Sequence, residues 1–439
     1  MVGLGKLGAP LAATLAASGV TVAGCDRDRE IVRALALGRP PIVEPGLEEM
    51  LARGRERLTA TTDTEAAVAD SDLTFIIVPT PSERSGRFSL RMLEEALRSV
   101  GRAIASKQAR HVVVITSTVM PGDSDGPLRQ VLELATGRSC GETLGLCYSP
   151  EFIALGRAIE GLRRPDFLLI GTHQAWAGAV LSELYKQMVE NDPPIATTTP
   201  VNAELVKLSV NSLVTARLSF ANMLAEICGG IPGAEVDIVT AAVGLDKRIG
   251  PHYLKGAVSF GGPCFPRDNR ALRWVAKQVN VDPIVSEATD AMNRRHDRYL
   301  ADLIEREMPC RGTLGILGLS YTVGTPVFEA SAGVRLAREM VRRGWQVAGY
   351  DPLVKAATSE FPPASFVLAP SAEDCIHGSD VVVVMTPCPE FAMLRFDDRK
   401  GATTVIDCWR LLPEAAVSGS GRRLIRLGDG PRDATGQEP

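Results

Sequence analysis

The sequence has no paired cysteines and no long apolar run, and these absences exclude several classes of protein. Its nine cysteines are scattered, without a C-x-x-C pair or a His/Cys cluster of zinc-site spacing, so we expect no metal. An odd, dispersed set indicates reduced thiols and a cytoplasmic protein rather than a disulfide framework. No apolar run reaches membrane-spanning length, and no secretory leader precedes the first motif.

The chain also has little net charge. It carries −4 over 439 residues, and its 45% apolar and 23% charged residues are ordinary for a globular protein. This balance gives no reason to expect nucleic acid or an anionic membrane surface as a partner. The length is sufficient for two or three domains.

A glycine-rich turn stands at the start of the chain. The run Gly3-Leu4-Gly5-Lys6-Leu7-Gly8 fits G-x-G-x-x-G and is followed by a helical pattern, an apolar strand and Asp26. In dinucleotide-binding units such glycines allow the pyrophosphate to approach closely, and the acid binds the ribose hydroxyls. Asp26 favours NAD over NADP because it would repel a 2′-phosphate. Only Met1 and Val2 precede the turn, so the first strand is either very short or largely missing from the sequence.

Two further apolar runs, 73–78 and 111–115, end at candidate cofactor residues. The first is followed by Pro79-Thr80-Pro81 and the second, after Thr116, by Ser117-Thr118. Alternating strands and helices predict a parallel sheet with helices on both faces. Ligands bind beyond the carboxyl ends of such strands, so these residues are predicted to lie near the cofactor.

Residues 200–228 predict one long helix, because they show helical periodicity without an internal proline or glycine. Such a helix would be about 40 Å long and would join two domains, with a further role as a subunit interface. Its predicted apolar side contains Leu205, Leu208, Leu213, Ala216 and Phe220.

The last third of the chain repeats the first. Residues 347–351 (VAGYD) echo residues 22–26 (VAGCD), which predicts a second Rossmann-like unit. Its glycine turn looks incomplete, because Tyr321 stands where a third glycine would follow Gly315 and Gly318. The prediction is an α/β chain with two doubly wound parallel-sheet domains, 1–195 and 301–425. A long central helix and a helical middle domain, 196–300, join them, and a flexible tail, 426–439, follows.

The segment 260–268 (FGGPCFPRD) places Cys264 in a stiff loop. Gly261 and Gly262 let the backbone turn sharply, and the two prolines restrict it. A thiol held in such a loop suits covalent chemistry on a carbonyl. The alternative is a buried cysteine beside a tight turn.

This organisation resembles the UDP-glucose/GDP-mannose dehydrogenase family almost from end to end. The resemblance is carried by the cysteine loop and by 41–47 (PIVEPGL), 117–119 (STV), 149–152 (SPEF) with Gly156, Pro165 and Asp166, Glu204-Leu205-Val206-Lys207 with Asn211, and 248–250 (RIG). It implies a four-electron oxidation of a sugar C6 alcohol to a carboxylate, with two NAD⁺ used in turn. Cys264 would add to the intermediate aldehyde, and the resulting thioester would be hydrolysed.

The resemblance also implies roles for individual residues. Lys207 and Asn211, four apart on one helix, would stabilise the oxyanions, and Glu151 would be the general base. Asp268 would orient water or set the proton balance near Cys264, or would only cap the structure. Thr118 is a further residue of the implied catalytic set.

The implied binding residues form two sets. The cofactor set consists of the glycine turn, Asp26, Pro79, Thr80, Pro81, Ser117, Thr118, Glu151 and Cys264. The substrate set consists of Glu151, Phe152, Ile153, Lys207, Asn211, Arg248, Tyr253, Leu254, Phe260, Gly261 and Phe265. Arg248 would reach the substrate of a partner subunit, which implies a homodimer through the central helices.

The chain departs from the family in its nucleotide-binding half. Thr322 replaces a lysine, Glu329 replaces an arginine, and Arg410 stands one position late. The F-G-G-x-C-F form of the loop favours UDP-glucose as substrate and UDP-glucuronate as product, for glycoside or polysaccharide biosynthesis. Three alternatives stay open: a UDP-N-acetylhexosamine or other nucleotide hexose as substrate, a nucleotide-sugar-binding protein without catalysis, and a two-electron hydroxyacid dehydrogenase.

Overall fold

The computed structural model describes residues 1–356, 358–362, 364–396, 403–417 and 422–431. Within them the chain forms two compact units, 1–210 with 274–280 and 211–273 with the described residues from 281 onward. Of the predicted flexible tail, residues 432–439 lie outside the described part. In the described part of that segment, 426–431, Leu427 is buried and the Gly430 N–H donates to the Ala234 carbonyl at 2.7 Å.

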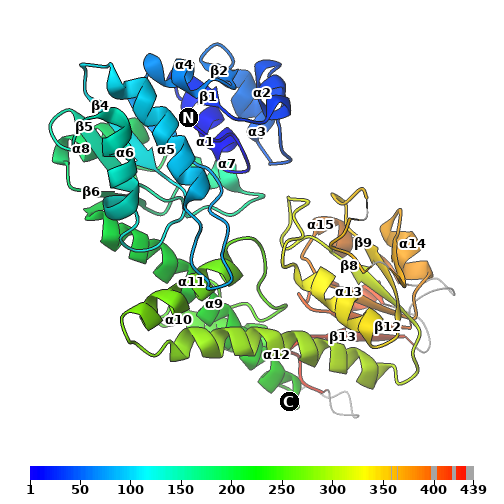
Figure 1. Cartoon of the computed structure of the whole chain (residues 1–439). Coiled ribbons are helices and arrows are strands. Elements are labelled where there is room, and N and C mark those ends of the chain that lie inside the picture. Colours follow the sequence, from blue (N-terminus) through cyan, green and yellow to red (C-terminus); the bar gives the residue numbers. More distant parts are fainter. Residues whose placement is uncertain (357, 363, 397–402, 418–421, 432–439) are drawn as a thin grey trace. The chain divides into compact units, whose positions relative to one another are not determined.

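The first unit contains a mainly parallel sheet with helices on its faces (Figure 1). Val2 forms bridges to Cys25 and to Ile76, so the short N-terminal segment joins two groups of strands, β1-β2 and β3-β4-β5-β6-β7. β6 runs antiparallel to β5. The strands are β1 Val22–Cys25, β2 Leu58–Thr61, β3 Leu73–Ile76, β4 His111–Ile115, β5 Leu144–Tyr148, β6 Leu168–Thr172 and β7 Ile195–Thr198.

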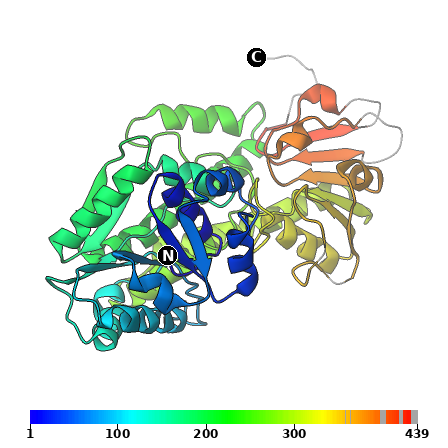
Figure 2. The same ribbon diagram turned by 90° about the horizontal axis from the view of Figure 1, so that it is seen from above.

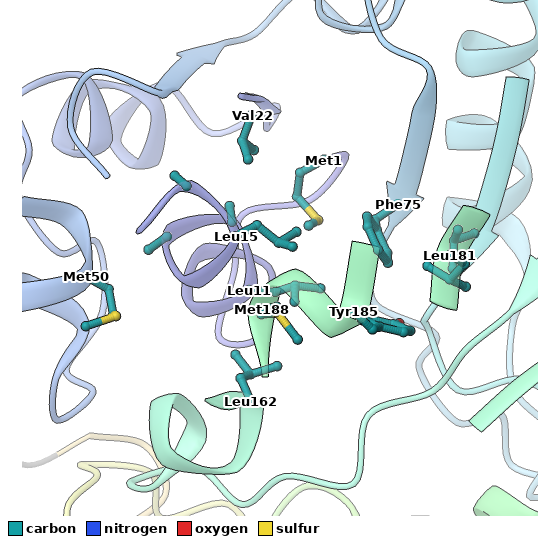
Figure 3. Close-up of a cluster of buried hydrophobic side chains, with 14 of the residues drawn as sticks. Met1, Leu11, Leu15, Val22, Met50, Phe75, Leu162, Leu181, Tyr185 and Met188 are labelled. Carbon is teal, nitrogen blue, oxygen red and sulfur yellow. The ribbon is translucent and has the colours of Figure 1, made fainter. Parts of the chain in front are cut away.

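The helices of this unit enclose a hydrophobic core, and α1 is part of that core. The helices are α1 Gly8–Ala17, α2 Arg29–Ala36, α3 Leu47–Arg53, α4 Thr64–Ala69, α5 Arg91–Ala105, α6 Arg129–Thr136, α7 Ala158–Arg163 and α8 Ala175–Met188. Figure 3 shows Leu11 and Leu15 of α1 gathered with Phe75 of β3 and Tyr185 of α8. α1 is apolar on nearly all sides and is buried over almost its whole length, so packing rather than surface charge stabilises the start of this helix.

The second unit contains a six-stranded sheet in the order β10-β9-β8-β11-β12-β13, and all of its pairs are parallel. Figure 2 shows these strands side by side, coloured from yellow to red. This is the strand order of a Rossmann fold, so the prediction of a second such unit is confirmed. The strands are β8 Thr313–Leu317, β9 Gln346–Tyr350, β10 Phe366–Leu368, β11 Val381–Val384, β12 Thr404–Asp407 and β13 Arg423–Arg426.

A central strand of this sheet, β11, is apolar along its whole length, as expected where helices cover both faces. β11 consists of four valines that are completely buried, which is typical of a central parallel strand between two helix layers. The helices that lie wholly in this unit are α10 Val236–Leu245, α12 Ile284–Glu307, α13 Ala332–Arg342, α14 Ala372–His377 and α15 Pro389–Ala392.

The long helix α9, Pro200–Gly229, confirms the predicted central helix. It begins at a proline, whose missing N–H is no loss in a first helical turn, and it ends at a glycine. The predicted apolar side is not one buried face: Leu208 is buried, whereas Leu213 and Phe220 are 65% and 44% exposed. The boundary between the two units falls within α9, and α11, Phe265–Gln278, begins in the second unit and ends in the first.

Candidate functional site

The glycine turn before α1 has the geometry of a pyrophosphate site. Gly3 has φ +93°, and a Cβ on it would lie 2.1 Å from the Ile77 carbonyl oxygen. A Cβ on Gly8 would lie 1.9 Å from the Gly3 oxygen, so only glycine lets α1 begin this close to the turn. A Cβ on Gly5, by contrast, would meet no protein atom within 4 Å. The space beside Gly5 therefore fits a ligand at the N-terminus of α1.

Asp26 holds the same turn from the end of β1. One carboxylate oxygen accepts from the Leu4 N–H at 2.7 Å, and the other accepts from the Asp28 N–H at 2.9 Å. Each carboxylate oxygen has a second lone pair, so the side chain can also accept a ribose hydroxyl. The residues present thus fit the adenosine half of NAD.

The ends of β3 and β4 are tied together by hydroxyl groups. The Ser117 hydroxyl accepts from the Val78 N–H at 2.9 Å and donates to the Val78 carbonyl at 2.7 Å. The Thr80 hydroxyl donates to the Thr118 carbonyl at 2.7 Å. These side chains stabilise the loop that contains the predicted cofactor residues 79–81 and 117–118.

A buried lysine and a perturbed carboxyl meet in the first unit. Lys207 of α9 is buried, and its ammonium donates to the Glu151 carbonyl oxygen at 2.6 Å and lies 4.9 Å from the centre of the Phe152 ring. The Phe152 ring packs on Phe167, with centroids 4.7 Å apart. Burial raises the pKa of the Glu151 carboxyl to about 7, and the Lys207 charge limits the rise. A carboxyl with this pKa can take up and release protons near neutral pH.

Sequence reasoning gave no role to Glu204, although the E-x-x-K pattern was the signal for it. Glu204 is completely buried one turn before Lys207 on α9. Its carboxylate accepts from the Gly122 N–H at 2.5 Å and from the Ser124 N–H at 2.8 Å. Burial raises its pKa to about 7. Glu204 therefore fixes the part of α9 that carries Lys207.

The cysteine loop of the second unit ends at the start of α11. Cys264 immediately precedes Phe265, the first residue of this helix, and its carbonyl accepts the Asp268 N–H at 2.8 Å. Its side chain is exposed, which excludes the alternative of a buried structural cysteine. An anionic sulfur here would lie at the positive end of the helix dipole.

Asp268, by contrast, is completely buried. Its carboxylate accepts from the Asn211 amide at 2.6 Å and from the Arg267 guanidinium at 3.2 Å. The second unit thus brings together the predicted residues Asn211, Cys264 and Asp268. Asp268 orients the Asn211 amide, which lies one turn after Lys207 on α9.

The other predicted substrate residues differ in exposure. Arg248 is exposed and forms an ion pair with Asp246 at 2.6 Å. Tyr253 is 52% exposed and has a positive φ, whereas Leu254 and Phe260 are buried inside the protein. Ile153 packs against the core of the first unit, and Phe265 is partly buried at the start of α11.

The glycine turn of the second Rossmann unit keeps its first and last glycines, Gly318 and Gly333, whereas Ser320 stands at the middle position; the prediction that Tyr321 replaces the last glycine is wrong. A Cβ on Gly333, at the start of α13, would lie 2.3 Å from the Gly318 oxygen, which repeats the contact between Gly8 and Gly3. Asp351 of this turn accepts from the Leu319 N–H at 3.0 Å, as Asp26 does from Leu4. A long insertion between the two glycines concealed the motif.

Arg410, the displaced arginine of the family pattern, forms an ion pair and hydrogen bonds within the second unit. It has φ +53°, and its guanidinium forms two 2.9 Å bonds with the Asp237 carboxylate of α10. It also donates to the carbonyl groups of Gly256 and Leu427. Arg410 therefore anchors α10 to the second sheet.

The described residues contain no group of three or more His, Cys, Asp or Glu residues that could hold a metal ion. No described helix is both long enough and apolar enough to span a membrane.

Comparison with known proteins assigns the family. Three domain models of one family match in order: the NAD binding domain over residues 1–189, the central domain over 201–295 and the UDP binding domain over 315–414. The chain belongs to the UDP-glucose/GDP-mannose dehydrogenase family. The resemblance inferred from the motifs is thus confirmed, and NAD is the cofactor that the first sheet binds.

Relatives within the UDP-glucose/GDP-mannose dehydrogenase family match along nearly their full length. The UDP-glucose 6-dehydrogenase AglM of Haloferax volcanii is 33% identical over 401 residues, which cover 90% of this chain and 92% of the relative. A GDP-mannose 6-dehydrogenase of Pseudomonas aeruginosa is also 33% identical, over 87% of this chain and 89% of its own. The structure of a UDP-glucose dehydrogenase from Pyrobaculum islandicum has a TM-score of 0.86 at 32% identity, over 98% and 97% of the chains.

Proposed function

We propose that the protein is an NAD-dependent 6-dehydrogenase that oxidises UDP-glucose to UDP-glucuronate. The observation that carries the proposal is the exposed Cys264 thiol at the N-terminus of α11, in a chain of this dehydrogenase family. A two-electron alcohol dehydrogenase would have no use for this thiol, whereas oxidation from alcohol to carboxylate has one.

NAD⁺, when bound, accepts one hydride from the sugar carbon in each of two oxidations. In the first oxidation, the C6 hydroxyl loses its proton and the carbon loses a hydride, which leaves an aldehyde. The Cys264 thiolate then adds to this aldehyde and forms a thiohemiacetal. Loss of the second hydride and of the hydroxyl proton gives a thioester. Water cleaves the thioester, so that the carboxylate is released and the thiol is restored.

The remaining residues have roles that match their environments. Lys207 brings a buried ammonium, and Asn211 has a second amide N–H besides the one donated to Asp268, so both can stabilise an oxyanion. Glu151, with a pKa of about 7, would accept the proton of the attacking water. Asp268, which is completely buried and accepts from the Asn211 amide, would position Asn211.

The decisive experiment is an assay of the purified protein with UDP-glucose, GDP-mannose and a UDP-N-acetylhexosamine. We expect UDP-glucose to be preferred, with two NADH formed per sugar. A ratio of one would contradict the four-electron route, and preference for GDP-mannose would support the alternative raised by the equally similar Pseudomonas relative.

Replacement of Cys264 tests the covalent route. Cys264→Ser should abolish carboxylate formation while NAD binding is unchanged, because the glycine turn is intact. Cys310→Ser is the matched control, since Cys310 is a second exposed cysteine outside the loop. Nucleotide-sugar binding without any oxidation by the wild-type protein would instead support a binding protein, the alternative raised by the loss of basic residues at Thr322 and Glu329.

We further propose a homodimer through α9. Leu213, Phe220 and Ile227 repeat every seven residues along this helix and are 65%, 44% and 47% exposed, so they form an apolar stripe. Burial of such a stripe against its copy would remove it from water. Leu213→Glu should convert the dimer to a monomer in light scattering, and a monomeric wild-type protein would refute the proposal. In such a dimer, Arg248 would be a candidate contact to the partner's substrate.

A further inference from the structure

Arg335 connects four segments of the second unit. It lies in the first turn of α13, and its Nε donates to the Asp297 carboxylate at 2.9 Å. One terminal nitrogen donates to the Ser259 hydroxyl at 2.6 Å and to the Phe260 carbonyl at 3.2 Å. The other donates to the Ala330 carbonyl. A single guanidinium therefore contacts α12, the cysteine loop and the end of the β8–α13 connection.

Hydrogen-bond donors and acceptors match in this network. The Ser259 hydroxyl accepts from Arg335 and donates its own proton to the Asp297 carboxylate. The side chains of Arg335 and Asp297 are only 27% and 25% exposed. Charge-assisted bonds in such partly buried surroundings are stronger and more directional than surface ion pairs, so the network can fix the backbone that it contacts.

The same stretch of the cysteine loop is held at two further points. The Asn293 side chain of α12 accepts from the Phe260 N–H at 2.8 Å and donates to the Phe260 carbonyl at 3.0 Å. The Gly262 N–H donates to the Glu329 carbonyl at 3.1 Å. Gly262 has φ +82°, and a Cβ on it would lie 2.5 Å from the Tyr321 ring. The β8–α13 connection is thus packed directly on the residues that lead to Cys264.

Ala330 shows that this packing is demanding. It is a non-glycine residue with φ +50°, a conformation that costs about 1 kcal/mol relative to the right-handed one. In this conformation its carbonyl oxygen contacts Gly261, where a Cβ would lie 2.1 Å away, and accepts from Arg335. The contacts with Gly261 and Arg335 are therefore available to offset the strain.

We propose that Arg335 is a positioning residue for Cys264. It acts through Ser259 and Phe260, which precede the cysteine by five and four residues, and it couples the nucleotide turn after β8 to the cysteine loop. This inference rests on the proposed function in taking Cys264 as the nucleophile. Arg335 touches no reacting atom; it fixes the loop from which the sulfur attacks.

Arg335→Lys is the sharpest variant, because it retains the positive charge beside Asp297 but cannot reproduce the guanidinium fork. We expect kcat to fall about tenfold to hundredfold, as for small displacements of a catalytic group, with KM for NAD⁺ and the melting temperature nearly unchanged. The matched control is Arg338→Gln, one turn later on α13, where the arginine pairs with Glu360 at the surface. This control should retain wild-type kcat.

A second readout does not depend on turnover. The rate at which iodoacetamide alkylates Cys264, followed in the full-length protein by mass spectrometry of its peptide, should differ by at least about threefold between Arg335→Lys and wild type. If the wild-type protein oxidises no nucleotide sugar and this difference is still found, the proposed function fails and the positioning role stands. Wild-type kcat and alkylation rate in Arg335→Lys would overturn the positioning role.

A double variant covers the case in which Arg335→Lys does not fold. Arg335→Gln combined with Asp297→Asn removes both charges of the pair, so that neither is left buried and uncompensated. We expect this protein to fold and to show the same loss of kcat. Wild-type kcat in the double variant, or an equal loss in Arg338→Gln, would show that the network only stabilises the fold.

Discussion

Glu151→Gln replaces a carboxyl whose ionised form is disfavoured by burial with a neutral side chain of the same shape. In the wild-type protein, burial raises the pKa of Glu151 from 4.5 to about 7 despite the nearby Lys207 ammonium. The folded protein therefore holds this proton more tightly than the unfolded chain does. Ionisation of Glu151 thus lowers the free energy of unfolding, and glutamine avoids that loss.

The sign and size follow from linkage. Below pH 4.5 the carboxyl is protonated in both states, and above about pH 7 it is ionised in both. Between these limits the folded state binds more protons, so wild-type stability falls as pH rises. At 1.4 kcal/mol per tenfold change in proton affinity, the total loss is about 3 kcal/mol. Glu151→Gln should therefore gain about 3 kcal/mol relative to wild type between pH 4.5 and 8.

The assay is denaturant unfolding of both proteins at several pH values in this range. Glu204, whose pKa is also about 7, is present in both proteins, so its contribution cancels in the comparison. Glu160→Gln is the control, because Glu160 is exposed on α7 and should give a difference that hardly depends on pH. A difference between Glu151→Gln and wild type that stays constant from pH 4.5 to 8 would refute the reasoning.

Other predictions concern the glycine turn that binds the cofactor and the hydrogen bond between Asn211 and Asp268. Gly8→Ala should abolish NAD binding, measured by calorimetry, because the new methyl group would lie 1.9 Å from the Gly3 oxygen; unchanged affinity would contradict this geometry. Asp26→Ala should weaken NAD binding by about 1–3 kcal/mol, through loss of a charged hydrogen bond and of its hold on the turn, and no change would exclude the ribose contact. Asn211→Ala should lower the free energy of unfolding by about 1–3 kcal/mol, since buried Asp268 loses a donor at 2.6 Å; denaturant unfolding measures this, and a neutral effect would show that the bond is dispensable.

Local patterns in the sequence predicted the elements of the fold well. His111–Ile115 is a strand with the predicted bounds, and the predicted helix 200–228 is one residue longer in the structure. Apolar periodicity is a local property, and packing reinforces it in both places. Periodicity identified apolar residues on α9 but could not distinguish those that are buried, such as Leu208, from those that are exposed, such as Leu213 and Phe220.

The site was predicted less completely, because its energetics depend on contacts distant in sequence. Nothing in the sequence of α13 distinguishes Arg335 from Arg338, yet Arg335 joins a partly buried network and Arg338 forms a surface ion pair. The fixed spacing of G-x-G-x-x-G likewise concealed Gly333. The proton affinity of Glu151 depends on burial, which no motif encodes.

The contact between Gly318 and Gly333 closes the β8–α13 connection at its base. Residues 319–331 leave the end of β8 and lead into α13 between two backbone positions that lie close together, so the distance between strand and helix does not depend on the length of the connection. The outer part of the connection is constrained instead by the cysteine loop, because the Ala330 carbonyl contacts Gly261 and the Tyr321 ring lies against Gly262. A change in the length of this connection would therefore disturb the residues before Cys264 and not the sheet.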